Sequence, residues 1–191
     1  MLVVRGKKIE VLFSASTIAR RNLELAKEIA AIPAHDLLVV SVLKGSFIFA
    51  ADLIRAMHDA GSAPEVEFIF ISSYGAGTTG GEVRLLRDID NDVRGRDLLL
   101  IDDILESGRT LLYTRDLMLS RGARSCRIAV LLDKRMRRKS PIEADHVGFD
   151  CPDHFVVGYG MDVAHAFREL PFVGIVRGEA EPGEEPRPTV S

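Results

Sequence analysis

The chain has 191 residues, of which 47% are apolar and 28% are charged, and its formal net charge is −3. This size and composition fit one soluble globular domain with its own core, and the slightly negative charge excludes general affinity for nucleic acid across the surface. No apolar run reaches the length of a membrane span, and charges interrupt residues 1–13, so we expect a cytoplasmic protein without a signal peptide.

Short aliphatic segments alternate along the chain with segments of helical pattern. The strand candidates are rich in branched apolar residues on both alternating faces, which is typical of parallel strands that are covered on both sides. In chain order these candidates are residues 36–43, 66–72, 98–102, 127–133, 154–160 and 172–176.

Three segments between the strand candidates have helical periodicity. Residues 14–31 place their apolar side chains on one stripe, with Ser14 or Ser16 as the N-cap. Residues 46–60 and 110–121 also predict helices, and Gly122 follows the last one at a C-cap position. The alternation of strand and helix predicts an α/β domain with right-handed crossovers.

The segment 98–110, LLLIDDILESGRT, joins a buried strand to a predicted helix. Ligands of open parallel sheets bind beyond the carboxyl ends of the strands. If the helix begins near Gly108, the amides of residues 107–110 converge on a site that favours an anion, such as a phosphate monoester. Asp102 and Asp103 would repel that phosphate, so we expect them to face sugar hydroxyls or Mg²⁺ on the same ligand. An ordinary strand end with solvated acids is the alternative.

Three further motifs are open to two interpretations. GAGTTG (75–80) matches the dinucleotide fingerprint, but the following GEVRLLRD indicates an extended segment instead of the required helix, which favours a lid loop that returns through a hairpin. Lys44 and Gly45 form either an anion site at a strand-to-helix junction or an ordinary turn. The basic run 134–139 is a nucleic-acid patch or, as we favour, a solvated loop.

The end of the chain and the cysteines add two expectations. Residues 178–191 are acidic and proline-rich, with too few apolar residues to offset the entropy of ordering, so we predict a disordered tail. No linker divides the rest, which predicts a single domain over residues 1–177. Cys126 and Cys151 lack metal-type spacing and are too few for a disulfide framework, so we expect reduced thiols.

Taken together, these motifs resemble the purine (hypoxanthine-guanine) phosphoribosyltransferases of the type I phosphoribosyltransferase family. The segments LLLIDDILESGRTL, VLKGSFIFAADL, SSYG, LLDK and PDHFVVGYGMD, followed by FREL, have the family's order and cover roughly residues 10–176. The resemblance implies a type I core, in which helices flank a mostly parallel twisted sheet. It also implies a small hood subdomain, formed by the N-terminal segment and residues of about 140–176.

The resemblance further implies an activity in purine salvage. Phosphoribosyl diphosphate and hypoxanthine, and also guanine, would give IMP or GMP and diphosphate, with Mg²⁺ as the cofactor. The transition state resembles an oxocarbenium ion at the ribose carbon, so catalysis has to neutralise the leaving diphosphate and position the purine nitrogen for attack.

Residues around the strand end would bind the phosphoribosyl diphosphate, as the resemblance implies. Asp102 and Asp103 would hold the ribose hydroxyls, directly or through metal, and Arg168 would add a cation on the diphosphate. The diphosphate would also contact Lys44 and Gly45, after a cis Leu43–Lys44 peptide. The residues that would cradle the 5′-phosphate are Glu106, Ser107, Gly108, Arg109 and Thr110, and those of the lid are Ser73 and Tyr74.

A second set of residues would bind the purine by the same resemblance. Lys134 would donate to the 6-oxo group, because an ammonium has only donors and mismatches the amino group of adenine. Phe155 would stack on the ring, and the backbone of Val156 would read the 2-position. Asp162 would help to bind a second metal. The implied metal ligands are therefore Asp102, Asp103 and Asp162.

Two positions depart from the family's pattern. Glu106 stands where the family usually has an aspartate that accepts a proton from the purine. Because glutamate keeps the charge and a similar intrinsic pKa, we predict that Glu106 still serves as the general base. His154 stands where many members carry a longer basic or acidic residue, which leaves the detailed fit around the purine open.

Two other functions stay open from the sequence. One is a regulator of the same fold that senses nucleotides and binds RNA through the basic run 134–139, although the intact set of Lys44, Lys134 and Arg168 favours an enzyme. The other is a phosphoribosyltransferase for another base, such as xanthine or uracil. The resemblance also implies a homodimer or homotetramer that binds small-molecule substrates and no membrane.

Overall fold

The computed structural model describes residues 2–73 and 83–177. Tyr74, the side chain of Ser73, the motif 75–80 and the predicted tail 178–191 therefore lie outside the described residues. Among the helices within those ranges, none is long and apolar enough to cross a membrane.

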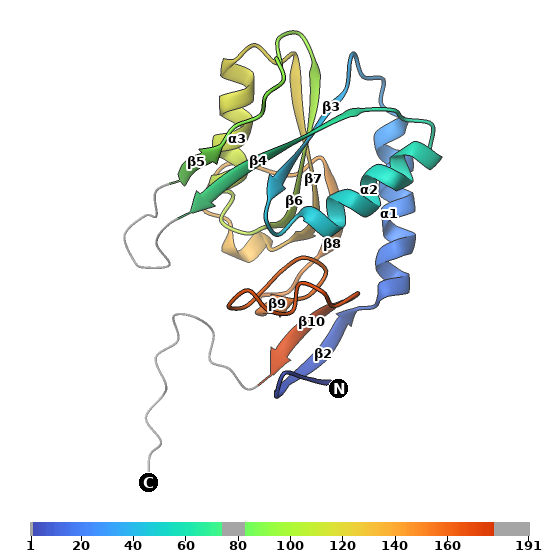
Figure 1. The fold of residues 1–191 in the computed structure, drawn as a ribbon, viewed down its shortest axis with the longest axis vertical. Coiled ribbons are helices and arrows are strands. Elements are labelled where there is room, and N and C mark those ends of the chain that lie inside the picture. Colours follow the sequence, from blue (N-terminus) through green and yellow to red (C-terminus); the bar gives the residue numbers. More distant parts are fainter. Residues whose placement is uncertain (1, 74–82, 178–191) are drawn as a thin grey trace.

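A six-stranded sheet forms the main body of the molecule (Figure 1). Its strand order is β5-β4-β3-β6-β7-β8. The five strands β4, β3, β6, β7 and β8 are parallel, and β5, at one edge, is antiparallel to β4. The prediction of a mostly parallel sheet is confirmed. The strands are β3 (Leu38–Leu43), β4 (Glu65–Ser73), β5 (Val83–Arg87), β6 (Asp97–Leu105), β7 (Ser125–Asp133) and β8 (His146–Asp150).

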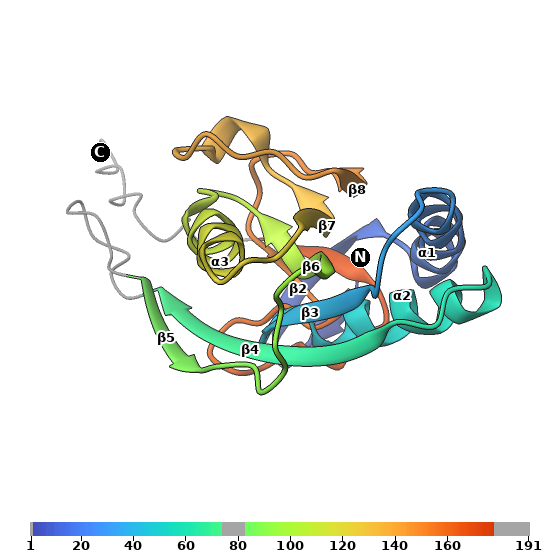
Figure 2. The same ribbon diagram turned by 90° about the horizontal axis from the view of Figure 1, so that it is seen from above.

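Helices cover both faces of this sheet (Figure 2). Helices α1 (Ala15–Ala30) and α2 (Phe47–Asp59) pack on one face, and α3 (Arg109–Ser120) packs on the other. In β6, Leu99 and Ile101 join the core on the α1 and α2 side, whereas the alternate residues, such as Leu100, join the core beneath α3. This two-sided burial explains why the strands are apolar at consecutive positions.

A second, four-stranded antiparallel sheet lies beyond the carboxyl ends of the large sheet's strands (Figure 1). Its order is β1-β2-β10-β9. It brings the N-terminal segment beside the end of the described chain. Its strands are β1 (Leu2–Val4), β2 (Lys7–Phe13), β9 (Val156–Val157) and β10 (Val173–Arg177).

Two expectations about the C-terminal third need correction. Residues 140–150 do not join the small sheet, because β8 pairs in parallel with β7 and thereby satisfies backbone groups that β7 would otherwise leave open at the sheet edge. The predicted strand 154–160 is reduced to the two residues of β9. Gly158, Tyr159 and Gly160 all have positive φ, which turns the chain out of the extended conformation.

Local signals in the sequence mark several element ends correctly. Ser14 is the N-cap of α1, and its hydroxyl oxygen accepts a hydrogen bond from the Thr17 amide at 3.2 Å. Gly122 follows α3 with φ +92°, a conformation that favours glycine after a helix. Strand β5 returns antiparallel to β4, as expected for an extended segment after the motif 75–80. A 3₁₀ turn, η1, spans Arg135–Arg137.

Candidate active site

Two adjoining cavities lie where β3, β6 and β7 end. The inner cavity, of about 270 Å³, lies between the turn after β3 and the loop after β6. The outer cavity, of about 610 Å³, extends from there toward the small sheet. Lys44, Asp103 and Glu106 line both, so the two cavities form one continuous cleft.

The cleft collects most of the residues that the sequence predicts for the site. Arg109 lines neither cavity. The inner cavity is lined by Lys44, Gly45, Asp102, Asp103, Glu106, Ser107, Gly108 and Thr110, and the outer cavity adds Lys134, Phe155, Val156, Asp162 and Arg168. Apolar side chains that sequence reasoning did not single out, such as Ile71 and Met161, complete the walls.

The loop after β6 turns its carbonyl oxygens away from the cleft. The carbonyls of Leu105, Glu106 and Ser107 accept hydrogen bonds from residues of the segment 134–140, which lies behind the loop. In a planar trans peptide the carbonyl and the following amide point in opposite directions, so the amides after these carbonyls face the cavity. Helix α3 begins directly afterwards, and its first-turn amides lack acceptors within the helix. The inner cavity is thus an amide-lined anion site.

Gly108 permits this geometry for two reasons. Its φ is +81°, in the left-handed region that side chains disfavour. A Cβ at this position would also lie 2.6 Å from Cγ2 of Ile142, which packs against the loop from behind. Any larger residue would therefore change the direction of the amides that line the cavity.

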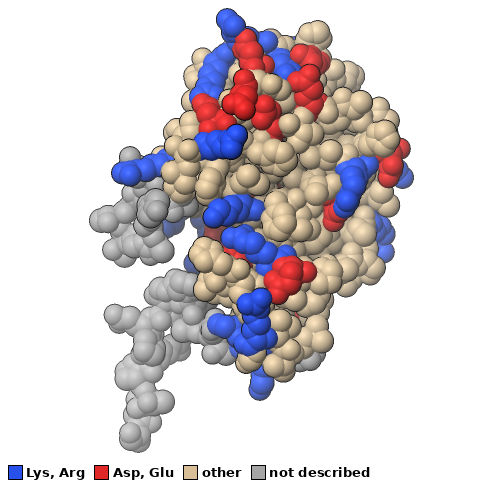
Figure 3. All heavy atoms as spheres, viewed as in Figure 1, with Lys and Arg blue, Asp and Glu red and all other residues tan. Residues whose placement is uncertain are grey.

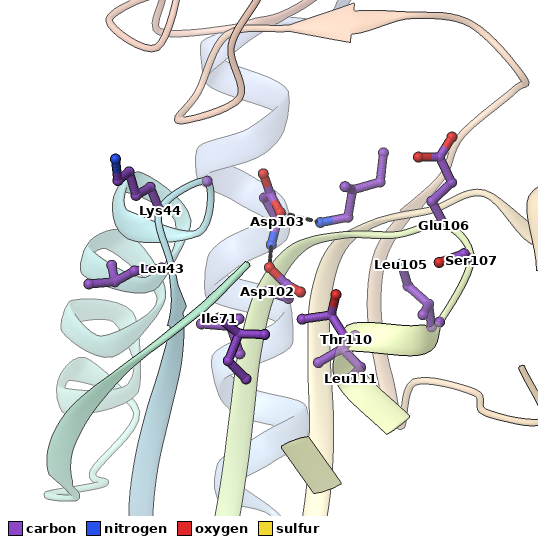
Figure 4. Close-up of a pocket in the computed structure, with 14 residues that line it drawn as sticks. Leu43, Lys44, Ile71, Asp102, Asp103, Leu105, Glu106, Ser107, Thr110 and Leu111 are labelled. Carbon is purple, nitrogen blue, oxygen red and sulfur yellow. Dashed lines mark hydrogen bonds between the residues drawn. The ribbon is translucent and has the colours of Figure 1, made fainter. Parts of the chain in front are cut away.

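Asp102 and Asp103 lie at the carboxyl end of β6, beside this loop (Figure 4). The Asp103 amide donates to Oδ1 of Asp102 at 2.9 Å, and the Ile104 amide donates to Oδ1 of Asp103 at 2.9 Å. Within residues 2–73 and 83–177, neither carboxylate forms an ion pair. Burial, together with the neighbouring Asp103 charge, raises the pKa of Asp102 well above its usual value, and burial also raises the pKa of Asp103.

The turn after β3 packs tightly against the acid pair. A methyl group at Gly45 would overlap the carboxylate of Asp103, and one at Gly160 would overlap the carbonyl oxygen of Gly45. The Leu43–Lys44 peptide is cis, as the resemblance implies. Nζ of Lys44 lies 5.2 Å from the centroid of the Phe70 ring. Glycines at these points allow three segments of the chain to meet around one carboxylate.

The outer cavity has cationic side chains on both sides. Lys134, which is 6% exposed, places Nζ 3.4 Å from Oε1 of Glu106. Across the cavity, Arg168 pairs with Asp162 at 2.6 Å and donates to the carbonyl oxygen of Gly160 at 2.6 Å. The cavity therefore presents a buried ammonium, a carboxylate and a guanidinium to one ligand.

The basic run 134–139 is not a patch of positive charge. Arg135 lies 3.1 Å from Asp133, Arg137 lies 2.5 Å from Asp153, and Arg138 also pairs with Asp133. On the face of the molecule that Figure 3 shows, Lys and Arg are likewise interspersed with Asp and Glu. The interpretation as a solvated loop is wrong for Arg138, whose side chain is only 16% exposed. Asp133, the acid that ends β7, is the sequence signal that points to this pairing.

The acids of the cleft fit a metal ion only if a ligand supplies further oxygens. Among residues 2–73 and 83–177, no three His, Cys, Asp or Glu side chains are grouped closely enough to hold a metal alone. Asp103 and Asp162 nevertheless line the same cavity. One or two carboxylates combined with phosphate oxygens are a usual ligand set for Mg²⁺, so the residues fit an ion that protein and substrate hold jointly.

Comparisons with known proteins agree on one family. Residues 11–164 match the family model described as a phosphoribosyl transferase domain. The chain is 42% identical over 172 residues to the hypoxanthine-guanine phosphoribosyltransferase of Streptococcus thermophilus, covering 89% of this chain and 94% of that protein. It is also 42% identical over 179 residues to the Aquifex aeolicus protein of the same name, covering 92% and 99% of the two chains. The crystal structure of a hypoxanthine phosphoribosyltransferase from Staphylococcus aureus matches with a TM-score of 0.82 and 38% identity, covering 88% of this chain and 91% of that one.

Proposed function

The chain belongs to the phosphoribosyltransferase family, and from this premise we propose how its cleft carries out purine salvage. The activity is that of a hypoxanthine-guanine phosphoribosyltransferase. A 6-oxopurine and phosphoribosyl diphosphate give a nucleoside monophosphate and diphosphate. The bond from the ribose carbon to the diphosphate oxygen breaks, and a bond from that carbon to a purine nitrogen forms.

The observation that carries the proposal is the meeting of an acid pair and an amide-lined anion site in one cavity. Asp102 is buried and Asp103 is half-buried, and neither has an ion pair within residues 2–73 and 83–177. Buried carboxylates without a cation are costly unless a ligand compensates them. A ligand that carries both hydroxyl groups and a phosphate monoester satisfies both halves of the cavity. The ribose 5-phosphate part of phosphoribosyl diphosphate is such a ligand.

The donor substrate then lies along the inner cavity. Its 5′-phosphate binds the amides and hydroxyls of residues 106–110, and its ribose hydroxyls bind Asp102 and Asp103. The diphosphate extends toward Lys44 and Arg168, whose charges stabilise it as the leaving group. Lys44 comes from the turn after β3 and Arg168 from the segment before β10, so these two charges lie on different parts of the fold.

The purine occupies the outer cavity, with one edge toward Lys134 and Glu106. The 6-oxo group and N7 lie side by side on that edge, and the two side chains lie 3.4 Å apart. Lys134 donates to the oxo oxygen, and the Glu106 carboxylate accepts the proton that the purine loses as it attacks the ribose. Phe155 stacks on the ring, and the Val156 backbone reads the 2-position.

We propose Mg²⁺ as the cofactor of this reaction. Asp102, Asp103 and Asp162 would hold it together with oxygens of the substrate. When bound, it neutralises phosphate charge on the donor and on the released diphosphate. The carboxylates would orient the ion, while Lys44 and Arg168 keep their own contacts with the diphosphate.

We propose that residues 1–177 act as one domain in the cytoplasm, with the small sheet as a hood over the purine. We further propose a homodimer or homotetramer as the working assembly. Size-exclusion chromatography with light scattering measures that state directly, and a monomer at micromolar concentration would contradict it.

A substrate panel tests the proposed function. The protein is incubated with phosphoribosyl diphosphate, Mg²⁺ and one base at a time, and nucleotide products are separated by chromatography. Hypoxanthine and guanine should give IMP and GMP, and adenine should give nothing, because Lys134 offers its amino group no acceptor. Xanthine and uracil test the alternative base specificities. The absence of any nucleotide product from the whole panel would refute the proposal.

The RNA-binding regulator gains no support from the structure. Its sequence basis was the basic run 134–139, and Arg135, Arg137 and Arg138 in that run are ion-paired with acids. Lys134 lies 94% buried in the cleft, where it cannot reach a polynucleotide backbone on the surface.

A further inference from the structure

Arg138 binds the back of the loop after β6 through its whole guanidinium group. Nε donates to the Glu106 carbonyl oxygen at 3.1 Å, and Nη2 lies 3.4 Å from the Leu105 carbonyl oxygen. Nη1 donates to the Ile142 carbonyl oxygen at 2.6 Å. The side chain therefore joins the loop to the segment that follows η1, on the side away from the cleft.

The charge of Arg138 is compensated within the protein. Its Nη2 pairs with Oδ1 of Asp133, whose side chain is 6% exposed. Arg138 lines neither the inner nor the outer cavity, so its charge is not presented to a ligand. A planar guanidinium suits this position, because it can bind one carboxylate and several carbonyls at once, which an ammonium cannot reproduce.

These contacts determine which way the loop peptides point. With the Leu105 and Glu106 carbonyls held by Arg138, the amides of the following residues are turned toward the inner cavity. A Cβ on Gly108 would lie 3.1 Å from Cδ of Arg138, so the Arg138 side chain packs directly beneath the loop. Without Arg138, the Leu105 carbonyl would keep its hydrogen bond from the Lys134 amide at 2.9 Å. Water could bind the Glu106 carbonyl instead, and the peptide between Glu106 and Ser107 would be free to rotate.

We propose that Arg138, held by Asp133, is a positioning residue for phosphate recognition: it orients the loop amides toward the phosphate without touching the ligand. This inference rests on the proposed function, in which that loop binds the 5′-phosphate. Lys44 and Arg168, which bind the diphosphate, come from other elements. Replacing Arg138 should therefore weaken binding of the 5′-phosphate end of phosphoribosyl diphosphate and leave binding of its diphosphate end unchanged.

The test compares two ligands in calorimetric titrations of the whole protein. Ribose 5-phosphate reports on the loop, and diphosphate with Mg²⁺ reports on the site of Lys44 and Arg168. Arg138→Gln should raise the Kd for ribose 5-phosphate about 10- to 100-fold, the scale of losing well-oriented charge-assisted contacts, and change the Kd for diphosphate less than about twofold. The KM for phosphoribosyl diphosphate should rise in parallel.

Arg135→Gln is the matched control, because Arg135 pairs with the same Asp133 at 3.1 Å but has a side chain that is 73% exposed. It should leave both affinities unchanged within about twofold. Arg138→Lys keeps the charge and loses the planar fork, so an intermediate loss of ribose 5-phosphate affinity is expected. If Arg138→Gln does not fold, as judged by its melting curve, Arg138→Lys provides the measurement.

Two results would overturn the inference. One is an Arg138 variant that folds and binds ribose 5-phosphate as the Arg135 control does. The other is an equal loss of affinity for both ligands, which would indicate a general structural role. Both results presuppose that the unmodified protein forms IMP, whereas failure of the proposed function would appear as no turnover in the unmodified protein itself.

Discussion

Strand β6 carries a buried acid at each end, and the two ends compensate that charge differently. At the amino end, Asp97 accepts hydrogen bonds from the His35 amide at 2.7 Å and from the Ser125 hydroxyl at 2.6 Å. At the carboxyl end, Asp102 and Asp103 accept backbone amides of their immediate neighbours, and their two carboxyl groups contact each other. Neither has an ion pair within the described part of the chain.

The pKa values follow this difference. The hydrogen bonds from His35 and Ser125 lower the pKa of Asp97, whereas burial raises the pKa of Asp102. An acid whose charge is satisfied inside the fold contributes to stability. Acids that lose solvent without gaining a compensating partner lower the stability of the fold. Such a cost is expected at a functional site, where a bound ligand supplies the missing partner. The carboxyl end of β6 is therefore the functional end.

The largest effect is expected at Glu106, just beyond the functional end. Glu106→Gln should lower kcat about 10²- to 10⁴-fold, because it removes the proposed proton acceptor while it keeps the size of the side chain. Steady-state turnover of hypoxanthine at saturating phosphoribosyl diphosphate measures this. Glu106→Asp, which keeps the carboxylate, is the control and should retain most of the activity. Unchanged turnover in Glu106→Gln would show that the base assignment is wrong.

The next effect distinguishes function from stability at the acid pair. Asp102→Asn and Asp103→Asn should each raise the KM for phosphoribosyl diphosphate about 10- to 150-fold, the cost of a lost hydrogen bond to a charged group. Asp102→Asn should at the same time raise the Tm by about 2 to 4 °C, because it removes a carboxyl group whose ionisation is disfavoured by burial and by the neighbouring Asp103 charge. Kinetics and thermal melting without substrate measure the two effects. A lower Tm together with normal kinetics would make Asp102 a structural residue.

The opposite result is expected at the amino end of the same strand. Asp97→Asn should lower the free energy of unfolding by about 1.5 to 3 kcal/mol, because the amide cannot accept the two hydrogen bonds as strongly as the carboxylate. Activity per folded molecule should stay within about twofold of the unmodified protein. Urea unfolding and steady-state kinetics at 25 °C provide the comparison. A large loss of activity in a folded Asp97→Asn protein would remove the distinction between the two ends.

The smallest effect is a dependence of stability on pH. Because the folded-state pKa of Asp97 lies below its unfolded value of about 3.9, its contribution is fully present above that unfolded value and is lost as the pH falls through the folded pKa. The difference in unfolding free energy between the unmodified protein and Asp97→Asn should therefore shrink below about pH 4. Urea titrations from pH 3 to pH 7 measure it. A difference that stays constant over this range would exclude ionised Asp97 as its source.

Much of the fold follows from local patterns in the sequence. The strands β3, β4, β6 and β7 are consecutive apolar runs because helices cover both of their faces, and this burial can be recognised without coordinates. Strand β8 escaped prediction, because His146, Gly148 and Asp150 interrupt its short apolar pattern. It becomes a strand through its pairing with β7.

The candidate site also has one part that the sequence predicts and another that only the fold brings together. The acid pair, Gly108 and the start of α3 are contiguous in the chain, so strand, acids and helix start are all local signals. Asp133 is a local signal for the ion pair of Arg138, but nothing local predicts that Arg138 binds the loop after β6, because the Glu106 carbonyl oxygen lies 32 residues away. The cleft itself joins segments from β3, β6, β7 and the small sheet.

Local sequence patterns are enough to predict the α/β alternation, the polar junction after β6 and the resemblance to a family. Only folding decided how the buried acids are compensated. Asp97 accepts hydrogen bonds from the His35 amide and the Ser125 hydroxyl, 62 and 28 residues away, and lies 3.7 Å from Arg124. Neither Asp102 nor Asp103 has an ion pair in the described part of the chain. The physical reason is the range of the interactions. Backbone conformation and apolar periodicity depend on neighbours along the chain, whereas the free energy of a buried charge depends on groups that only folding brings within hydrogen-bonding distance.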